Sequence, residues 1–306
     1  MKGPVLVVMA AGMGSRYGGL KQMDKIGKNG EVLLDYSVYD ALKSGFEKVV
    51  FIIRHDIEKD FREQVLTRMG SKVKWELAFQ DPDSLIPGDI FAAAQRAGRT
   101  KPWGTAHALL CAADNIDAPF CVLNSDDFYG REAFAVIGKH LCGPGADEPV
   151  IVPYRLEDTL SPGGTVARGV CEISGGYLVS IDELTAIEKK DGRICNTNPN
   201  GSIEELAADT PVSMNFWGFP GSVLPEFKIY FDKFLESFAA DIPGQIKSEC
   251  FIPKAADYFT KQGIIKIKAL RANSGWFGVT YREDRDMAVQ KIAGLTAAGI
   301  YPASLW

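Results

Sequence analysis

Residues Val5 to Lys21 have the sequence Val-Leu-Val-Val-Met-Ala-Ala-Gly-Met-Gly-Ser-Arg-Tyr-Gly-Gly-Leu-Lys, and this stretch predicts the fold. Its apolar start is long enough for one buried strand and too short to span a membrane. Gly12 and Gly14 allow a ligand to approach the backbone, and successive amide groups in such a loop form an anion-binding concavity. Arg16 and Lys21 add positive charge beside it. The stretch therefore predicts a strand that ends in a triphosphate-binding loop.

Two common phosphate-binding motifs do not match this loop. A P-loop requires Gly-x-x-x-x-Gly-Lys-Ser/Thr, which the sequence lacks. A dinucleotide-binding fingerprint requires a third glycine where this chain has Tyr17. A glycine-rich turn without a ligand remains an alternative, but such a turn would not require Arg16 and Lys21.

The string Gly12-Met-Gly-Ser-Arg16, followed by Lys21, resembles the signature loop of the sugar-1-phosphate nucleotidyltransferases, also called nucleotide-sugar pyrophosphorylases. Leu20 replaces the proline that usually precedes the lysine. The resemblance implies that Arg16 and Lys21 are catalytic cations that neutralise phosphate charge. It also implies a set of nucleotide-binding residues in and before the loop, which are Ala10, Ala11, Gly12, Gly14 and Ser15.

Length and composition favour an ordinary α/β enzyme. With 306 residues, we expect a single domain over 1–306, whose nucleotide-binding half is 1–140 and whose sugar-phosphate-binding half is 141–306. The formal net charge of −5 gives no general attraction to nucleic acid or to anionic membranes. The cysteines form no Cys-x-x-Cys pair, and the first apolar run is too short for a secretory signal. We expect a cytoplasmic protein and a possible homo-oligomer.

Alternating strand and helix patterns follow the loop. Residues 31–44 and 56–69 have helical apolar spacing, whereas 48–54 and 73–79 have the pattern of strands. This order predicts a Rossmann-like α/β sandwich of three layers, with a mixed and mostly parallel central sheet. Ligands of such sheets bind outside the carboxyl ends of the strands.

The residues that bind the nucleobase are expected in the next part of the chain. Gln80 ends the third strand, and the resemblance implies that it contacts the nucleobase. Residues 81–101 are rich in Asp, Pro, Gly and Arg, and they are longer than the usual family segment. Gly104 and Thr105 match a family motif at the start of a helix, where the backbone approaches the nucleotide. His107 stands where the family often has Gln or Glu, and is equally consistent with a packed or solvated helix residue.

Two adjacent carboxylates follow the next buried strand, 120–123. Asp126 and Asp127 lie in the string Asn124-Ser-Asp-Asp-Phe-Tyr-Gly130, which resembles a metal-binding segment of the family. Oxygen ligands beside a triphosphate suit Mg²⁺, which takes few protein carboxylates together with phosphate oxygens. We expect Asp126 to be the metal ligand and a catalytic residue, and Asp127 to orient it or to contact the sugar. A helix N-cap is the alternative.

The sugar-phosphate side is expected in the second half of the chain. Residues 166–173 and 176–183 predict a hairpin across a Ser-Gly-Gly turn. Within it, Gly169 resembles a sugar-facing glycine of the family and Glu183 resembles its carboxylate for sugar hydroxyl groups. Asn215, in a later apolar strand, is expected either to face the sugar or to be satisfied by backbone.

The sequence departs from the family at the residue expected to bind the sugar phosphate. The family commonly has Glu-Lys-Pro, but Leu184 stands at the lysine position. Lys189 is the expected substitute, with Lys190 or Arg168 as alternatives.

A second departure concerns the metal. The family often has an aspartate in a Trp-x-Asp motif as a second Mg²⁺ ligand, whereas this chain has Gly278 there. Either Glu283 or Asp284 supplies the second carboxylate, or the metal relies on Asp126, phosphate and water.

The resemblance implies a Mg²⁺-dependent transfer between a nucleoside triphosphate, with UTP or dTTP favoured, and a sugar 1-phosphate, which gives a nucleotide-sugar and pyrophosphate. Three alternatives stay open. They are a GT-A-type glycosyltransferase, a non-catalytic nucleotide-sugar binder, and a cytidylyltransferase that acts on phosphocholine or another phosphomonoester.

Overall fold

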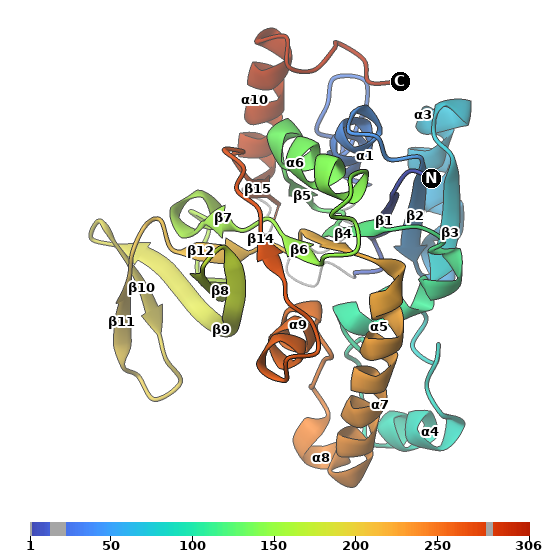
Figure 1. Cartoon of the computed structure of the whole chain (residues 1–306), viewed down its shortest axis with the longest axis vertical. Coiled ribbons are helices and arrows are strands. Elements are labelled where there is room, and N and C mark those ends of the chain that lie inside the picture. The colour runs from blue at the N-terminus through green and yellow to red at the C-terminus, as the bar shows by residue number, and fades with distance from the viewer. Residues whose placement is uncertain (1, 13–22, 280–283) are drawn as a thin grey trace.

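A central twisted sheet with helices on both faces forms the body of the protein (Figure 1). The computed structural model describes residues 2–12, 23–279 and 284–306. Arg16 and Lys21, like Gly14 and Ser15, lie outside the described residues. In the part of the chain that is described, thirteen strands join in one sheet and two more form a separate short pair.

The first half of the chain contributes a parallel section of this sheet. The strand order is β3-β2-β1-β4, and all three pairings are parallel. Each strand is short and mostly apolar, as expected for strands that helices cover on both faces. The bounds are Val5–Met9 for β1, Lys48–Ile53 for β2, Trp75–Phe79 for β3 and Phe120–Asn124 for β4.

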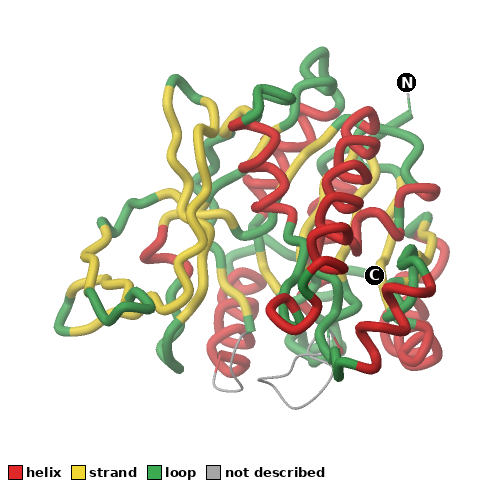
Figure 2. Tube along the Cα trace, turned by 90° about the horizontal axis from the view of Figure 1, so that it is seen from below, coloured by secondary structure: helices red, strands yellow, loops and turns green. Residues whose placement is uncertain are grey.

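The second half continues the same sheet with mixed pairings in the order β13-β6-β14-β9-β8-β12-β7. The long hairpin β8–β9 also carries β10 and β11, which project away from the helices at one side of the molecule (Figure 2). The bounds are Val150–Ile151 (β6), Tyr154–Arg155 (β7), Val166–Ser174 (β8), Tyr177–Lys190 (β9), Arg193–Thr197 (β10), Ile203–Leu206 (β11), Pro211–Ser213 (β12), Trp217–Phe219 (β13) and Lys268–Ala269 (β14). The separate pair is β5 (Asp127–Phe128) and β15 (Phe277–Gly278).

Two hydrophobic clusters lie on opposite faces of the sheet, because successive strand side chains point to opposite sides. Leu6 and Val8 face a layer that contains α1 and α6, whereas Val5 and Val7 face a layer that contains α5, α7 and α9. The α-helices are Leu33–Lys43 (α1), Glu58–Phe61 (α2), Thr67–Met69 (α3), Gly88–Arg96 (α4), Thr105–Cys111 (α5), Arg131–Leu141 (α6), Leu224–Ala240 (α7), Ile242–Gln245 (α8), Ile252–Lys261 (α9) and Asp284–Ala297 (α10). A π-helical turn, η3 (Arg62–Leu66), joins α2 to α3, and the 3-10 turns are η2 (His55–Ile57), η4 (Gly70–Lys72), η5 (Ala113–Asn115), η6 (Leu156–Thr159) and η7 (Gly221–Val223).

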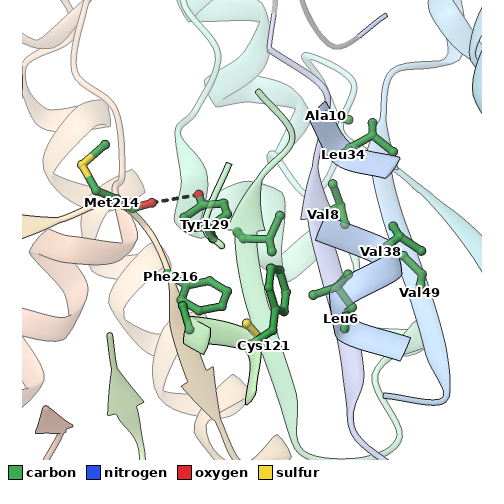
Figure 3. Packing of buried hydrophobic residues seen from close by; sticks show 14 of the residues in the cluster. Leu6, Val8, Ala10, Leu34, Val38, Val49, Cys121, Tyr129, Met214 and Phe216 are labelled. Atoms are coloured by element: carbon green, nitrogen blue, oxygen red, sulfur yellow. Dashed lines mark hydrogen bonds between the residues drawn. The ribbon is translucent and has the colours of Figure 1, made fainter. Parts of the chain in front are cut away.

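Figure 3 shows the first of these layers, where Leu6 and Val8 of β1 face Leu34 and Val38 of α1. On the other side of β4, the buried hydroxyl group of Tyr129 donates a hydrogen bond of 2.9 Å to the carbonyl oxygen of Met214. This bond ties the segment after β5 to the loop after β12. The two halves of the chain are therefore joined directly beneath the expected ligand site.

The predicted three-layer α/β fold with a mixed sheet is confirmed, and the deviations are local. The apolar run 211–220 forms two strands, because Asn215 takes a left-handed conformation with φ of 58° between them. Asparagine tolerates this conformation better than most residues. Residues 81–101, which had no predicted element, contain α4. Among the described helices, none combines the length and the apolar character that a membrane crossing requires.

Candidate active site

Two cavities meet at the carboxyl ends of the parallel strands. The larger has a volume of about 860 Å³ and is lined by residues that follow all four strands, including Gly12, Arg54, Gln80 and Asp126. The smaller, of about 260 Å³, lies toward the β8–β9 hairpin. Asp126 lines both cavities, so ligands in the two would meet at its carboxylate.

The described part of the glycine loop lies at the larger cavity. Ala11 and Gly12 line it, and the backbone amide of Ala10 donates to Ile52 with an N···O distance of 2.8 Å, which continues the β1–β2 pairing. A Cβ atom on Gly12 would have nothing within 4 Å among the described residues.

Arg54 is a cation at this site that the motif analysis missed. It directly follows β2, its Nη1 atom donates to the carbonyl oxygen of Ala11 at 3.3 Å, and its other nitrogens pair with Asp56. Its place at the carboxyl end of a buried strand was the signal that would have identified it.

Gly104 has no room for a side chain. Its φ is 103°, and a Cβ atom there would lie 2.3 Å from the carbonyl oxygen of Cys250. The next residue, Thr105, accepts a hydrogen bond of 2.9 Å from the amide of Ile252 through its hydroxyl oxygen. Segments 103–105 and 250–252 are thus packed backbone to backbone, and this contact fixes the wall of the larger cavity beside Gln80.

The two carboxylates after β4 have different surroundings. Asp126 is half-buried at the cavity wall, whereas Asp127 is buried, accepts a hydrogen bond from Asn124 Nδ2 at 2.9 Å, and has its Oδ2 atom 3.2 Å from the Tyr129 hydroxyl oxygen. Burial, together with the adjacent charge of Asp126, raises the pKa of Asp127 well above its usual range. The partly exposed Asp126 is therefore the member of the pair better suited to hold charge at the site.

The residues present fit a magnesium ion that is bound both by protein carboxylate oxygens and by phosphate oxygens of a ligand. Among the described residues, no group of three or more His, Cys, Asp or Glu side chains is arranged to hold a metal. Mg²⁺, however, usually takes one or two carboxylates together with substrate phosphates and water. Asp126, at the wall common to both cavities, meets that requirement.

Four of the predicted sugar-phosphate residues line the smaller cavity, namely Asp127, Gly169, Glu183 and Asn215. Antiparallel pairing of β8 and β9 places Gly169 opposite Glu183. A Cβ atom on Gly169 would approach the Glu183 Oε2 atom to 3.4 Å and the Ile181 Cγ2 atom to 2.9 Å, so glycine leaves the carboxylate accessible. The Asn215 Oδ1 atom is buried and has no hydrogen-bond partner within the described chain, which leaves it able to accept one from a ligand.

Lys189 is not brought to this cavity. It lies on the exposed end of β9 where that strand pairs with β10, and Leu184 packs against the core. Burial raises the pKa of the Glu183 carboxyl group, and the charges of two other cations, Lys254 and Arg168, oppose this rise. Lys254 belongs to α9, so sequence spacing alone could not relate it to Glu183.

Arg168 lines the smaller cavity but is firmly held by its own neighbourhood. Its Nε atom donates to Thr159 Oγ1 at 3.1 Å, and its Nη1 atom donates to the Ala167 carbonyl oxygen at 2.8 Å. The guanidinium group also lies over the ring of Trp276, with 5.3 Å between the Cζ atom and the ring centroid. Lys254 is exposed, so its flexible side chain is the better candidate for a cation that moves to a ligand.

A three-layer α/β sandwich with two adjoining cavities beside a carboxylate is typical of an enzyme that brings two ligands together. Residues 5–154 match the family model described as nucleotidyl transferase. This match places that segment in the nucleotidyl transferase family, as the resemblance implied, and the chain is a transferase of that type. No curated protein matches the chain significantly.

Two solved structures have the same fold over nearly their whole length. One is the inositol-1-phosphate CTP transferase from T. maritima, with a TM-score of 0.63, 13% identity and 97% coverage of each chain. The other is a putative glucose-1-phosphate thymidylyltransferase from Bacillus anthracis, with a TM-score of 0.60, 13% identity and 94% coverage of each chain. At this identity the likeness establishes the fold and leaves the substrates to be inferred.

Proposed function

We propose that the protein transfers a nucleotidyl group from a pyrimidine nucleoside triphosphate to the 1-phosphate of a sugar or cyclitol, with release of pyrophosphate. The observation that carries this proposal is the position of Asp126 on the wall shared by a large and a small cavity. Both neighbouring structures carry names of enzymes that pair a pyrimidine nucleotide with such a phosphate, which supports the same choice. The proposal includes UTP, dTTP and CTP as candidate nucleotides.

In the reaction we propose, an oxygen of the acceptor phosphate attacks the α-phosphorus in line. The bond between the α-phosphorus and the α,β-bridging oxygen breaks, and pyrophosphate leaves with that oxygen. The attacking oxygen is already an anion, so no general base is needed. The barrier is the approach of two polyanions, and the protein lowers it by positioning them and by neutralising charge.

Each part of the chain has a proposed role in that approach. The backbone at Gly12 and the cations Arg16 and Lys21 hold the triphosphate, and Arg54 adds charge at the end of β2. In the smaller cavity, Glu183 and Asn215 orient the hydroxyl groups of the acceptor.

Asp126, with Asp127 beside it, would hold Mg²⁺, and the ion would supply neutralisation of phosphate charge there. Asp127 keeps Asn124 and Tyr129 in place around this position through its own hydrogen bonds.

The decisive experiment measures pyrophosphate release by the purified protein with Mg²⁺. UTP, dTTP, CTP, GTP and ATP are each combined with glucose 1-phosphate, inositol 1-phosphate and phosphocholine. Release that requires one pyrimidine nucleotide and one sugar or cyclitol phosphate is the expected result. Pyrophosphate release only with phosphocholine would show that the acceptor is not a sugar or cyclitol phosphate. If no combination releases pyrophosphate, the proposal is overturned. Tight binding of a nucleotide-sugar without turnover would then favour a binder or a glycosyltransferase.

A further inference from the structure

Gln80, at the end of β3, is held by two hydrogen bonds that use both hydrogens of its amide group. Its Nε2 atom lies 3.1 Å from the carbonyl oxygen of Gly104 and 3.1 Å from the Nδ1 atom of His107. A backbone carbonyl oxygen can only accept a hydrogen bond, so the amide nitrogen, and not the amide oxygen, must face Gly104. This contact fixes which end of the Gln80 amide points toward α5.

The imidazole of His107 is fixed by the same reasoning. Its Nε2 atom lies 2.6 Å from the carbonyl oxygen of Ser84, which can only accept, so Nε2 must carry the hydrogen. The Cys111 Sγ atom, 3.5 Å from the same nitrogen, is a weaker neighbour. The Nδ1 atom is then unprotonated and accepts from Gln80. Burial lowers the pKa of His107 to about 4, which agrees with a neutral ring at pH 7.

The carbonyl group of Ser84 is itself held in place by the long segment 81–101. The Ser84 hydroxyl oxygen accepts from the amide of Asp81 at 3.0 Å, and the Trp103 indole nitrogen donates to the carbonyl oxygen of Pro82 at 2.7 Å. The His107 ring is wholly buried and stacks on Phe231, with 5.2 Å between the ring centroids. The arrangement around Gln80 is therefore held by the protein's own groups.

No described residue donates a hydrogen bond to Gln80 Oε1, and Gln80 lines the larger cavity. We propose that His107 is a positioning residue that makes Gln80 an acceptor toward the base, so that the protein recognises its nucleotide through an N–H group on the base edge. That group is N3–H in uracil or thymine and the 4-amino group in cytosine. The proposal rests on the proposed function, because it assumes that this cavity holds the base of a pyrimidine nucleotide.

A glutamine with a free amide would behave differently. It could donate to one base atom and accept from the next, as amide side chains do when they bind a base edge through two bonds. With both hydrogens engaged, Gln80 makes a single contact, and the acceptor atoms of the base must be satisfied elsewhere. Loss of the base N–H should then remove the whole contribution of Gln80.

The first test concerns the protein without nucleotide. The chain has three histidines, so ¹⁵N NMR can assign each ring. We expect His107 at pH 7 to be neutral, with hydrogen on Nε2 and an unprotonated Nδ1. A hydrogen on Nδ1 would overturn the proposal whatever the protein catalyses, so this measurement separates it from the proposed function.

The second test uses nucleotides that lack the N–H group. Binding of UTP is compared with that of N3-methyl-UTP, and binding of CTP with that of 4-deamino-CTP, which adds no bulk. The analogue of the preferred nucleotide should bind about 10-fold more weakly, as expected for the loss of one hydrogen bond. In Gln80→Ala this difference should disappear. Equal binding of parent and analogue in the unmodified protein would overturn the proposal, as would an unchanged difference in Gln80→Ala.

A matched pair of variants isolates His107. Leucine and asparagine have nearly the same shape, and both lose the bond to Ser84, but only asparagine keeps an acceptor near the position of Nδ1. His107→Leu should raise the KM for the nucleotide about 10-fold without changing kcat. It should also reduce the discrimination, that is, the difference in affinity between the parent nucleotide and the analogue that lacks the N–H group. His107→Asn should retain most of that discrimination. Identical behaviour of the two variants would show a structural role only and would overturn the proposal.

A failure of both proposals is also distinguishable. If no nucleoside triphosphate binds the unmodified protein, the proposed function fails. The role of His107 in base recognition then fails with it, even if NMR finds the expected protonation of the His107 ring. If a nucleotide binds and turns over but the analogues bind equally, the function stands and only the role of His107 is overturned.

Discussion

Gly278 lies opposite Asp127 in the antiparallel pair β15–β5, and a Cβ atom on residue 278 would lie 2.5 Å from the Oδ1 atom of Asp127. The same atom would lie 2.7 Å from the indole ring of Trp276. Asp127 and Trp276 thus fill the space around residue 278, the position where the resemblance led us to expect a second metal-binding aspartate. A carboxylate cannot simply be restored at this position.

Substitution of Gly278 should therefore be harmful. Gly278→Ala forces a Cβ atom into this closely packed site, and overpacking of this kind costs about 1–3 kcal/mol of unfolding free energy. Gly275→Ala is the matched control, because a Cβ atom there would have no neighbour within 4 Å among the described residues. Urea denaturation of both variants measures the difference. Gly278→Asp should lower turnover as well, and a gain in turnover or in Mg²⁺ affinity would contradict this account.

The carboxylate shared by the two cavities should be indispensable for turnover. Asp126→Asn keeps the size of the side chain but removes its charge, so we expect kcat to fall by roughly 10²–10³-fold, as when one preorganised electrostatic contact is lost. The unfolding free energy should stay within about 0.5 kcal/mol of the original. Glu249→Gln is the control, because Glu249 lines the larger cavity but not the smaller. Steady-state pyrophosphate release would test both, and near-normal turnover of Asp126→Asn would refute the assignment.

The contact between Gly104 and Cys250 should be as sensitive as a core position. Gly104→Ala places a methyl group 2.3 Å from the Cys250 carbonyl oxygen in a conformation with positive φ, so we expect a loss of at least about 3 kcal/mol, the upper part of the range for overpacking. Gly88→Ala, at the start of α4, has open space around its Cβ position and should be neutral. Thermal denaturation compares them. Equal stability of the two variants would show that the 103–105 wall is looser than its geometry implies.

Much of the fold follows from local patterns, which explains why it could be predicted. The strand before Gly12, the strand before Asp126 and the hairpin across Gly175 and Gly176 each depend on a few consecutive residues. The hairpin turn needs positive φ at both glycines, and the structure has 58° and 83° there. The larger cavity then follows from the rule that parallel strands present their carboxyl ends at one edge.

The rest of the site depends on contacts between distant segments. Lys254 acts on Glu183 only because α9 packs beside β9, and Ser84 meets His107 only because segment 81–101 folds back on α5. No spacing in the sequence encodes these pairs. His107 itself had no distinguishing pattern, since a buried histidine and a solvated one look alike in a short helix.

The neutral ring of His107 should make stability depend on pH. Burial lowers the pKa of His107 in the folded protein to about 4, whereas 6.5 is its ordinary value. The full stabilisation is therefore present above pH 6.5 and is lost as the pH falls toward 4, because the unfolded chain then binds a proton that the folded chain does not. The loss amounts to about 3 kcal/mol at ~1.4 kcal/mol per pKa unit. Urea denaturation at pH 7 and pH 4.5 should show a smaller decrease in His107→Asn, and equal decreases would contradict this.

The cation that binds the acceptor phosphate should be Lys254 and not Lys189. The Lys254 Nζ atom lies 5.7 Å from the ring centroid of Phe251, a residue that lines the smaller cavity, and its charge acts on Glu183 in the same wall. Lys189 instead lies on the exposed part of β9 that pairs with β10. Lys254→Ala should therefore lower kcat/KM for the acceptor phosphate by roughly 10–100-fold, the range for one hydrogen bond to a charged group.

The same substitution should leave the KM for the nucleotide nearly unchanged, because Lys254 is not among the residues that line the larger cavity. Lys189→Ala provides the matched control, since it removes the same charge from the surface of the same half of the chain. Initial rates with each substrate varied in turn distinguish the two effects. If Lys189→Ala is the variant that loses activity with the acceptor, the β9–β10 extension must move onto the cavity during turnover, and the sequence-based assignment of Lys189 would be correct.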